Sequence, residues 1–230
     1  MPLTEITSAS IKLDLTSFST VINPLPAASP NLFDAQVYDR GNLQFSNQGS
    51  NGNMNISLGE SGFTGLWFNT TGDYRWTIGL SPKVPIDLTI RASSGSSNVD
   101  LSGLQLTRLT YTGSSGSNDL KLPSNTKAYN MTYHGSSGST DITLPADANL
   151  TMSLDGSSGS ISVQIQGNAA VRVEVNGNGS GSVSVNDRLK RLSGSSNRDE
   201  GVWESSGYAQ ADQKILIIVA HVSSGSISIN

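Results

Sequence analysis

Short segments in which apolar and polar residues alternate run along most of the chain, and in its second half they flank a recurring Ser/Gly motif. In one such unit Leu109 and Tyr111 precede the motif and Leu120 and Leu122 follow it, each pair separated by one polar residue. The same spacing occurs before other motifs at Met131/Tyr133, Met152/Leu154 and Val173/Val175, and after them at Val99/Leu101, Ile142/Leu144, Ile161/Val163, Val183/Val185 and Ile227/Ile229. Alternation with a period of two on both sides of a turn predicts half-buried β-strands.

The Ser/Gly motif itself recurs at a nearly constant interval. It reads SSGS or a close variant, and its glycines (the corner glycines) are Gly95, Gly116, Gly138, Gly159, Gly181 and Gly225. The first four intervals are 21, 22, 21 and 22 residues, and the last is 44, twice the period. A fixed period in this range is typical of a solenoid. Gly/Ser runs often act as flexible linkers, but here glycine is expected to supply a tight corner conformation, while the serine hydroxyls bond local backbone.

These patterns predict an all-β fold, a single-stack β-solenoid of the parallel β-helix kind with 21–22-residue rungs and Gly/Ser corners. Each rung would consist of a corner, a strand, a short bend and a second strand, with equivalent residues of neighbouring rungs about 4.8 Å apart. If the whole chain follows this plan in sequence order, it holds roughly ten rungs over roughly 50 Å.

One continuous domain is expected over residues 1–230. Its segments are irregular rungs with longer loops at 1–90, regular rungs at 91–185, an insertion at 186–211 and a final rung at 212–230. The insertion replaces one corner and carries Trp203 and Tyr208. We expect it to fold over a face of the solenoid, where its aromatic residues would serve as a hydrophobic plug.

Composition and charge exclude several classes of partner and site. The chain has a net charge of −4 and only 14% charged residues, so no nucleic-acid partner is expected. It has no cysteine, which excludes disulfides and thiolate metal sites. Its first residues do not resemble a signal peptide, and its most apolar run, Ile215–Ala220, is too short to span a membrane. No membrane span is therefore expected in this chain; the expected location is cytoplasmic if the chain is complete, and the cell envelope or surface if it is an excised domain.

One stretch resembles a known family. Residues 76–109 read WTIGLSPKVPIDLTIRASSGSSNVDLSGLQLTRL, with a Trp-led strand, VPIDL at 84–88, a small-residue corner, DLSGL at 100–104, and the pair Arg108–Leu109. This run is similar to the toast-rack β-solenoid domains, which include the C-terminal domains of LiaF-like envelope-stress proteins and adhesin-like domains of unknown function. The resemblance extends over nearly the whole chain and implies a solenoid. The chain departs from the family in its SSGS corners, which in relatives are more often Gly-Ala-Gly-like, and in showing no N-terminal membrane helix.

Candidate chemistry is sparse. The chain has two histidines, His134 and His221, and each lies four residues before a corner glycine, so both are expected in one outward-facing column. With rungs stacked in chain order they would be four rungs, roughly 19 Å, apart and unable to bind one metal together. Each is therefore interpreted as a solvated surface histidine. Ser136 and Ser137 lie near His134, but other rungs form the same corner without histidine, which disfavours a Ser/His nucleophile.

Two carboxylates are the other candidates. Asp119 and Asp141 each lie three residues after a corner glycine and are expected to face outward on adjacent rungs. Stacked carboxylates repel unless a cation intervenes, and Ca²⁺ prefers oxygen ligands, so the pair is either a weak Ca²⁺ site or two screened surface acids. Their spacing reaches the lower limit for glycoside hydrolysis, but Tyr111 and Tyr133 are expected to point inward, which leaves no aromatic platform. No enzyme activity and no cofactor are predicted.

The expected function is that of a non-catalytic structural or interaction module that presents a rigid Ser/Thr-rich surface. The chain ends at SISIN, within a rung, and an uncovered final strand offers unpaired backbone groups to another chain. Either the insertion covers this strand, or the C-terminal rung mediates adhesion or self-assembly into homo-oligomers or filaments. As an alternative, the resemblance implies a sensory or regulatory domain of an envelope-stress system that docks a protein partner, with Trp203 and Tyr208 as candidate contacts.

Overall fold

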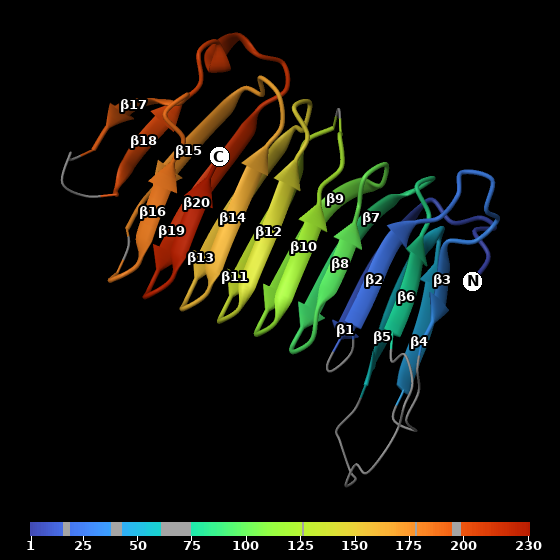
Figure 1. Cartoon of the computed structure of the whole chain (residues 1–230). Coiled ribbons are helices and arrows are strands. Elements are labelled where there is room, and N and C mark those ends of the chain that lie inside the picture. Colours follow the sequence, from blue (N-terminus) through green and yellow to red (C-terminus); the bar gives the residue numbers. More distant parts are fainter. Residues whose placement is uncertain (16–18, 38–42, 61–74, 126, 178, 195–198) are drawn as a thin grey trace, which may run out of the picture.

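The computed structural model describes residues 1–15, 19–37, 43–60, 75–125, 127–177, 179–194 and 199–230. Two long sheets enclose one apolar core (Figure 1). The first contains, in spatial order, β17 (Lys190–Ser193), β18 (Gly201–Glu204), β15 (Val171–Val175), β19 (Ile215–Val222), β13 (Leu150–Gly156), β11 (Tyr129–Gly135), β9 (Gln105–Gly113), β7 (Pro85–Ala92), β1 (Ser8–Leu15), β5 (Asn53–Glu60) and β4 (Leu43–Ser50). The second contains β16 (Ser182–Val185), β20 (Ser226–Ile229), β14 (Ser160–Ile165), β12 (Ser139–Leu144), β10 (Ser117–Lys121), β8 (Ser97–Asp100), β2 (Ser19–Pro24), β6 (Arg75–Leu80) and β3 (Phe33–Gln36).

One strand of each sheet forms a rung, and the rungs stack in parallel as the predicted β-solenoid requires. The described residues form eight rungs, in spatial order β5/β6, β1/β2, β7/β8, β9/β10, β11/β12, β13/β14, β19/β20 and β15/β16. The all-β solenoid prediction is confirmed, but the stack is shorter than the roughly ten rungs expected. The difference arises because β3, β4, β17 and β18 pair antiparallel at the two ends of the stack and belong to no rung.

The apolar columns predicted from the alternation face the interior. One column of the first sheet passes through the buried residues Leu88, Leu109, Met131, Met152, Ile217 and Val173. Tyr111 and Tyr133 also point inward, as predicted. Because side chains alternate between the two faces of a strand, a slip of one residue would turn the core residues of that strand towards solvent. The alternation therefore sets the register of each strand.

The corner glycines form a column in which neighbouring corners touch. A Cβ atom on Gly116 would overlap the carbonyl oxygen of Gly95, and one on Gly138 would overlap the carbonyl oxygen of Gly116. Gly138 also has φ of 92°, in the region that favours glycine. Backbone hydrogen bonds continue from corner to corner, as where Ser158 N–H donates to the carbonyl of Ser136 at 2.9 Å. The Ser/Gly motif is therefore a hydrogen-bonded corner.

The rungs are not stacked in chain order, which corrects the expectation of an open C-terminal rung. In the second sheet β20 pairs with β14 on one side and with β16 on the other, and in the first sheet β19 lies between β13 and β15. The corner glycines follow the same order, because a Cβ on Gly225 would meet Gly159 and one on Gly181 would meet Gly225. The final rung is thus paired along both edges and offers no strand for assembly. At the other end, β1 is likewise inserted between β5 and β7.

The segment 186–211 closes the end of the stack and does not fold over a face. Within it β18 pairs antiparallel with β15 and β17 pairs antiparallel with β18, so the segment extends the first sheet past its last rung (Figure 1). It continues through the three-residue 3₁₀ helix η1 (Tyr208–Gln210). This is the sole helix in the described part of the chain, and no helix there is long and apolar enough to cross a membrane.

A hydrogen-bonded polar network is buried among the apolar columns. Asn118 is at its centre: its Oδ1 accepts hydrogen bonds from the hydroxyls of Ser97 and Tyr111, both at 2.7 Å, and its Nδ2 donates to Thr140 Oγ1 at 3.2 Å. The Tyr133 hydroxyl joins through Thr140, and the two tyrosine rings stack with centroids 5.7 Å apart. Burial raises the pKa of both tyrosines, which therefore stay neutral and keep their protons for these bonds.

Candidate interaction surfaces

The C-terminal cap, formed by β17, β18 and η1, contains both aromatic residues predicted to contact a partner. Trp203 stands opposite Val173 of β15, and its half-buried side chain packs against the core. The guanidinium carbon of Arg191, on β17, lies 4.8 Å from the centre of the Trp203 ring. Tyr208 is also half-buried, with Lys214 Nζ at 5.5 Å from its ring centre. Trp203 therefore covers the end of the core from within the chain, and Tyr208 contacts Lys214 at the surface of the cap.

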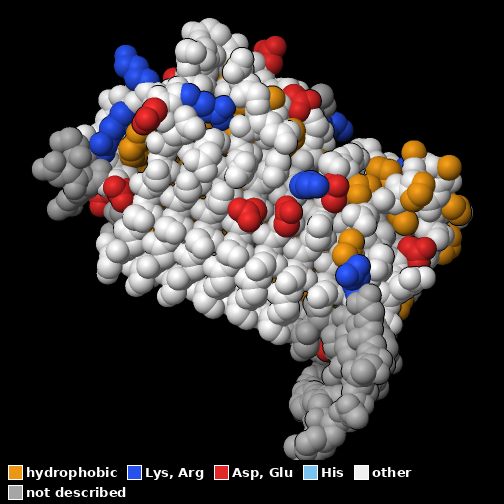
Figure 2. Space-filling model, viewed as in Figure 1, with side chains coloured by type: hydrophobic (Ala, Val, Ile, Leu, Met, Phe, Trp, Pro, Cys, Tyr) orange, Lys and Arg blue, Asp and Glu red, His pale blue; other side chains and the backbone are white. Residues whose placement is uncertain are grey.

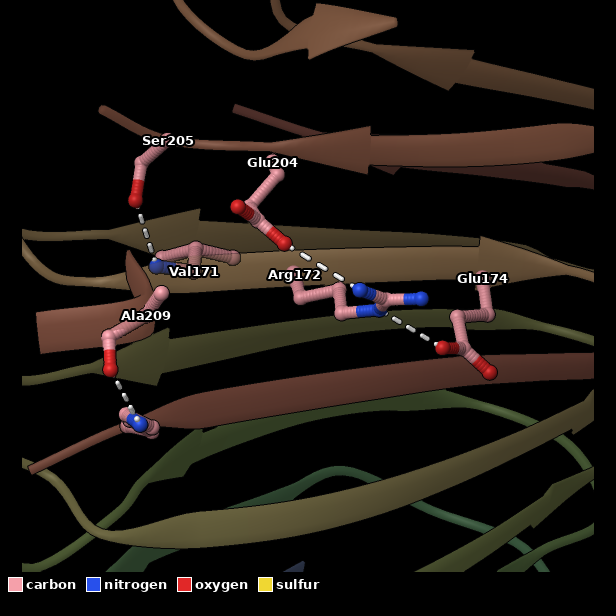
Figure 3. Close-up of polar contacts among 7 residues, drawn as sticks. Val171, Arg172, Glu174, Glu204, Ser205 and Ala209 are labelled. Atoms are coloured by element: carbon pink, nitrogen blue, oxygen red, sulfur yellow. Dashed lines mark hydrogen bonds and ion pairs between the residues drawn. The ribbon is translucent and has the colours of Figure 1, made fainter. Parts of the chain in front are cut away.

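An ion-pair bridge fastens the C-terminal cap to the last rung (Figure 3). The Arg172 side chain, on β15, donates to Glu174 on its own strand at 2.7 Å and to Glu204 on β18 at 3.1 Å. The hydrogen bond to Glu174 is the main cause that raises the pKa of Arg172. Nearby, the Ser205 hydroxyl accepts from the backbone N–H of Val171 at 2.8 Å. These contacts satisfy polar groups that would otherwise be exposed where the parallel stack ends.

The two candidate Ca²⁺ ligands lie side by side on the outer face of the second sheet. Asp119 of β10 stands directly opposite Asp141 of β12, and both are exposed. Figure 2 shows a few charged side chains in the middle of this face, surrounded by uncharged polar surface. In the part of the chain that the structure describes, no three His, Cys, Asp or Glu side chains are gathered in an arrangement that could hold a metal. The pair has the geometry of two opposed surface acids.

Removing one of these charges is expected to stabilise the fold. Like charges directly opposite each other on neighbouring strands are destabilising, so Asp141→Asn should raise the free energy of unfolding by roughly 0.2–1 kcal/mol. Urea unfolding at low and high salt measures this effect, which salt should reduce. If Asp141→Asn is instead less stable, and added Ca²⁺ stabilises the native protein, the two carboxylates share a cation.

The two histidines lie closer together than chain order implied. His134 on β11 stands opposite Asp155 on β13, and Asp155 stands opposite His221 on β19. The expectation of four rungs between the histidines is therefore wrong, because the inserted final rung brings His221 within two strands of His134. Ser137, considered as a nucleophile beside His134, donates its hydroxyl hydrogen to the carbonyl of Ser114 at 2.7 Å.

Three of the four strands at the sheet ends have their outer edges protected. Strand β3 has only four residues, and Met1 occupies its edge at the first of them, where the Met1 amino group donates to the carbonyl of Phe33 at 2.7 Å. At the edge of β16, the Asp199 carboxylate accepts from the backbone N–H of Val183 at 2.9 Å. Strand β17 has only four residues, two of them basic, and its register shifts between Arg191 and Ser193. Short, charged and irregular edges resist pairing with another chain.

Strand β4 is the exception. It is eight residues long (LQFSNQGS), has no charged residue and no proline, and pairs with β5 without any register shift. The hairpin between them turns at Asn51 and Gly52, whose φ values of 50° and 80° fit a type I′ turn. Antiparallel pairing then alternates along β4, so the N–H groups of Phe45, Asn47 and Gly49 point away from β5. Within the described ranges, no strand lies beyond β4.

Apolar side chains gather at the same end of the molecule as β4. Figure 2 shows them over the N-terminal segment and the loop that follows β2. The exposed members include Pro2, Pro26, Ala27, Ala28 and Pro30. Phe45 of β4 is 48% exposed and stacks on Phe33 of β3 with ring centroids 6.2 Å apart. Among the described residues, this end therefore combines a strand edge that no further strand pairs with and exposed apolar side chains.

Comparisons with known proteins agree with this architecture. A solved structure of a "putative cell adhesion protein" from Clostridium sporogenes is similar over 100% of this chain and 95% of that chain, with a TM-score of 0.65 and 14% sequence identity. At this identity the likeness concerns the fold alone. No curated protein matches the chain. Residues 25–144, more than half of the sequence, match a family model described as the N-terminal domain of toast_rack, and the chain therefore belongs to the toast-rack family.

Proposed function

We propose that this protein is a non-catalytic interaction module that self-associates by antiparallel pairing of β4 with β4 of a second copy. The toast-rack family and the name of the similar solved structure favour an interaction role over an enzymatic one. The observation that carries the proposal is the β4 edge, which is long, regular and uncharged while the other three edges are protected. An adhesive role follows if the copies are displayed on separate surfaces.

The charge distribution is compatible with a second copy at this edge. The chain has a net charge of −4, so two copies repel each other over most of their surface. Strand β4 contributes nothing to that repulsion because it has no charged residue. Two β4 strands related by a two-fold axis would satisfy the outward N–H and C=O groups of Phe45, Asn47 and Gly49 in both copies, since an isologous interface is self-complementary.

The test is a proline placed on the outward edge. Asn47→Pro removes an N–H that points away from β5, so the β4–β5 ladder should survive while pairing with a second copy is blocked. Asn47→Thr retains the N–H and is the matched control. We expect sedimentation equilibrium to show a concentration-dependent dimer in the native protein and in Asn47→Thr, with the dimer dissociation constant raised at least about tenfold in Asn47→Pro. Each tenfold rise in the dissociation constant corresponds to a loss of about 1.4 kcal/mol of binding free energy.

Two results would overturn the proposal. One is a monomer throughout the accessible concentration range, which would mean that the β4 edge is covered or receives a strand from a different protein. The other is a dimer that Asn47→Pro leaves unchanged, which would place the interface elsewhere. Thermal unfolding followed by circular dichroism checks that Asn47→Pro retains the fold.

A further inference from the structure

Both histidines of the chain lie in one outward-facing row with a carboxylate between them. The row crosses three adjacent parallel strands, with His134 on β11, Asp155 on β13 and His221 on β19. Neighbouring strands are about 4.8 Å apart, so the two histidine backbones are separated by roughly 10 Å, with Asp155 midway. The side chains of His134 and Asp155 are 51% and 47% exposed, and His221 is exposed as well.

A β-bulge places His221 in this row. The pairing of β13 with β19 is regular up to Leu154 and Val219, and then Asp155 stands opposite His221, so Ala220 is the extra residue. Without the bulge, Ala220 would stand opposite Asp155 and the next side chain would point towards the core. With it, Ala220 and His221 are both exposed and Val222 returns to the interior. Bulges that redirect a side chain are frequent beside functional sites.

The local contacts of the three groups are as follows. His134 Nδ1 is 3.4 Å from Asp155 Oδ2, and His221 Nε2 is 3.0 Å from the Ser223 hydroxyl. In this arrangement the three groups do not surround one point. The same holds for every set of three His, Cys, Asp or Glu side chains among the described residues. His134 already contacts the Asp155 carboxylate. For all three groups to bind one ion, the exposed His221 side chain has to rotate from Ser223 towards Asp155.

We infer that His134, Asp155 and His221 form a surface binding site for a divalent transition metal. Two imidazole nitrogens and one carboxylate oxygen form a ligand set that suits Zn²⁺, Ni²⁺ and Cu²⁺. An ion held above Asp155 is flanked by one imidazole on each side, and the open side of the site faces solvent, where water completes the coordination. The site rests on the order of the rungs and is independent of the proposed β4 pairing, since it lies on the outer face of the first sheet.

The experiment is titration of the whole chain with ZnCl₂ and with NiCl₂, each alone, by isothermal calorimetry and by NMR of the histidine ring signals. Because the chain has only two histidines, each ring is assignable from one variant. We expect one ion per chain, with both rings perturbed together. His221→Ala, His134→Ala and Asp155→Asn should each weaken binding by about tenfold or more, of the order found when a supporting group of a metal site is removed.

Two further variants separate this site from non-specific binding. Ser223→Ala removes the present partner of His221 while keeping all three ligands, so binding should be retained or tightened. Asp141→Asn removes an exposed carboxylate from the other sheet and should leave the binding of Zn²⁺ and Ni²⁺ unchanged. The inference is overturned if neither ion binds, if only one histidine ring responds, or if His221→Ala or Asp155→Asn binds as tightly as the native protein. All of these residues are exposed or half-buried at the surface, and circular dichroism confirms that each variant is folded before titration.

Discussion

Replacing Gly138 with alanine is expected to destabilise the solenoid by about 2–4 kcal/mol. Two costs combine at this position: φ of 92° is a conformation that alanine adopts only under strain, and the new Cβ overlaps the carbonyl oxygen of Gly116 in the neighbouring rung. The first is of the order of 1 kcal/mol or more, and relieving such an overlap costs typically about 1–3 kcal/mol. Because the new Cβ meets backbone atoms, the neighbouring corner has to shift to make room for it.

Two other glycines separate these contributions. Gly103 has φ of 82°, and a Cβ added there would have no atom within 4 Å, so Gly103→Ala carries only the conformational cost. At Gly159 φ lies outside the left-handed region, but a Cβ would overlap the carbonyl oxygen of Gly138, so Gly159→Ala carries only the overlap. Urea unfolding of the three variants should place Gly138→Ala as the least stable. Equal losses in Gly138→Ala and Gly103→Ala would show that the corners do not stack as tightly as the structure indicates.

The rung plan was predictable because its signals are local in sequence. Alternation such as Leu109–Tyr111 and Leu120–Leu122 shows which side chains face the core, and the interval between corner glycines gives the rung length. Neither signal depends on how distant segments pack. The corner composition was also informative, since the stacking of Gly138 on Gly116 leaves room for no side chain.

The order of the rungs was not predictable from the same signals. Ile227 and Ile229 alternate just as Ile161 and Val163 do, so their rung fits equally well at the end of the stack or inside it. The C-terminal cap accounts for the observed order. Its strand β18 pairs with the outer edge of β15, and the final rung pairs on both sides within the stack. Whether the edge of a strand is hydrogen-bonded depends on the assembled sheet and cannot be predicted from one segment.

The outward column of the two histidines was predicted, but their closeness across Asp155 was missed for that reason. The buried positions of β19 are Ile215, Ile217 and Val219, followed by Val222, and this step of three breaks the alternation. Such a break is typical of a bulge, and it occurs at His221. The bulge keeps His221 in the predicted outward-facing column, whereas the placement of Asp155 beside it depends on the rung order.

The polar network around Asn118 gives the second large expected effect, and it bears on how similar rungs find their partners. Asn118→Ala leaves the Ser97 and Tyr111 hydroxyls without their shared acceptor and opens a cavity, so we expect a loss of about 2–4 kcal/mol in the free energy of unfolding. The loss is limited because Ser97 and Tyr111, 2.7 Å apart, still bond to each other. Asn98→Ala, at an exposed position on the adjacent strand, is the control and should stay within about 0.5 kcal/mol of the native protein.

Replacing the whole network tests whether it contributes stability or pairing specificity. The same interior column is apolar further along the stack, where Ile161, Ile227 and Val183 follow Thr140. A variant combining Ser97→Ala, Tyr111→Phe, Asn118→Leu, Tyr133→Phe and Thr140→Val removes these five polar side chains at once, and its stability should recover much of what Asn118→Ala loses. If the network serves to align otherwise similar rungs, this variant should refold with lower yield despite its recovered stability. Native refolding yield together with recovered stability would show that the apolar columns and corners alone determine the rung order.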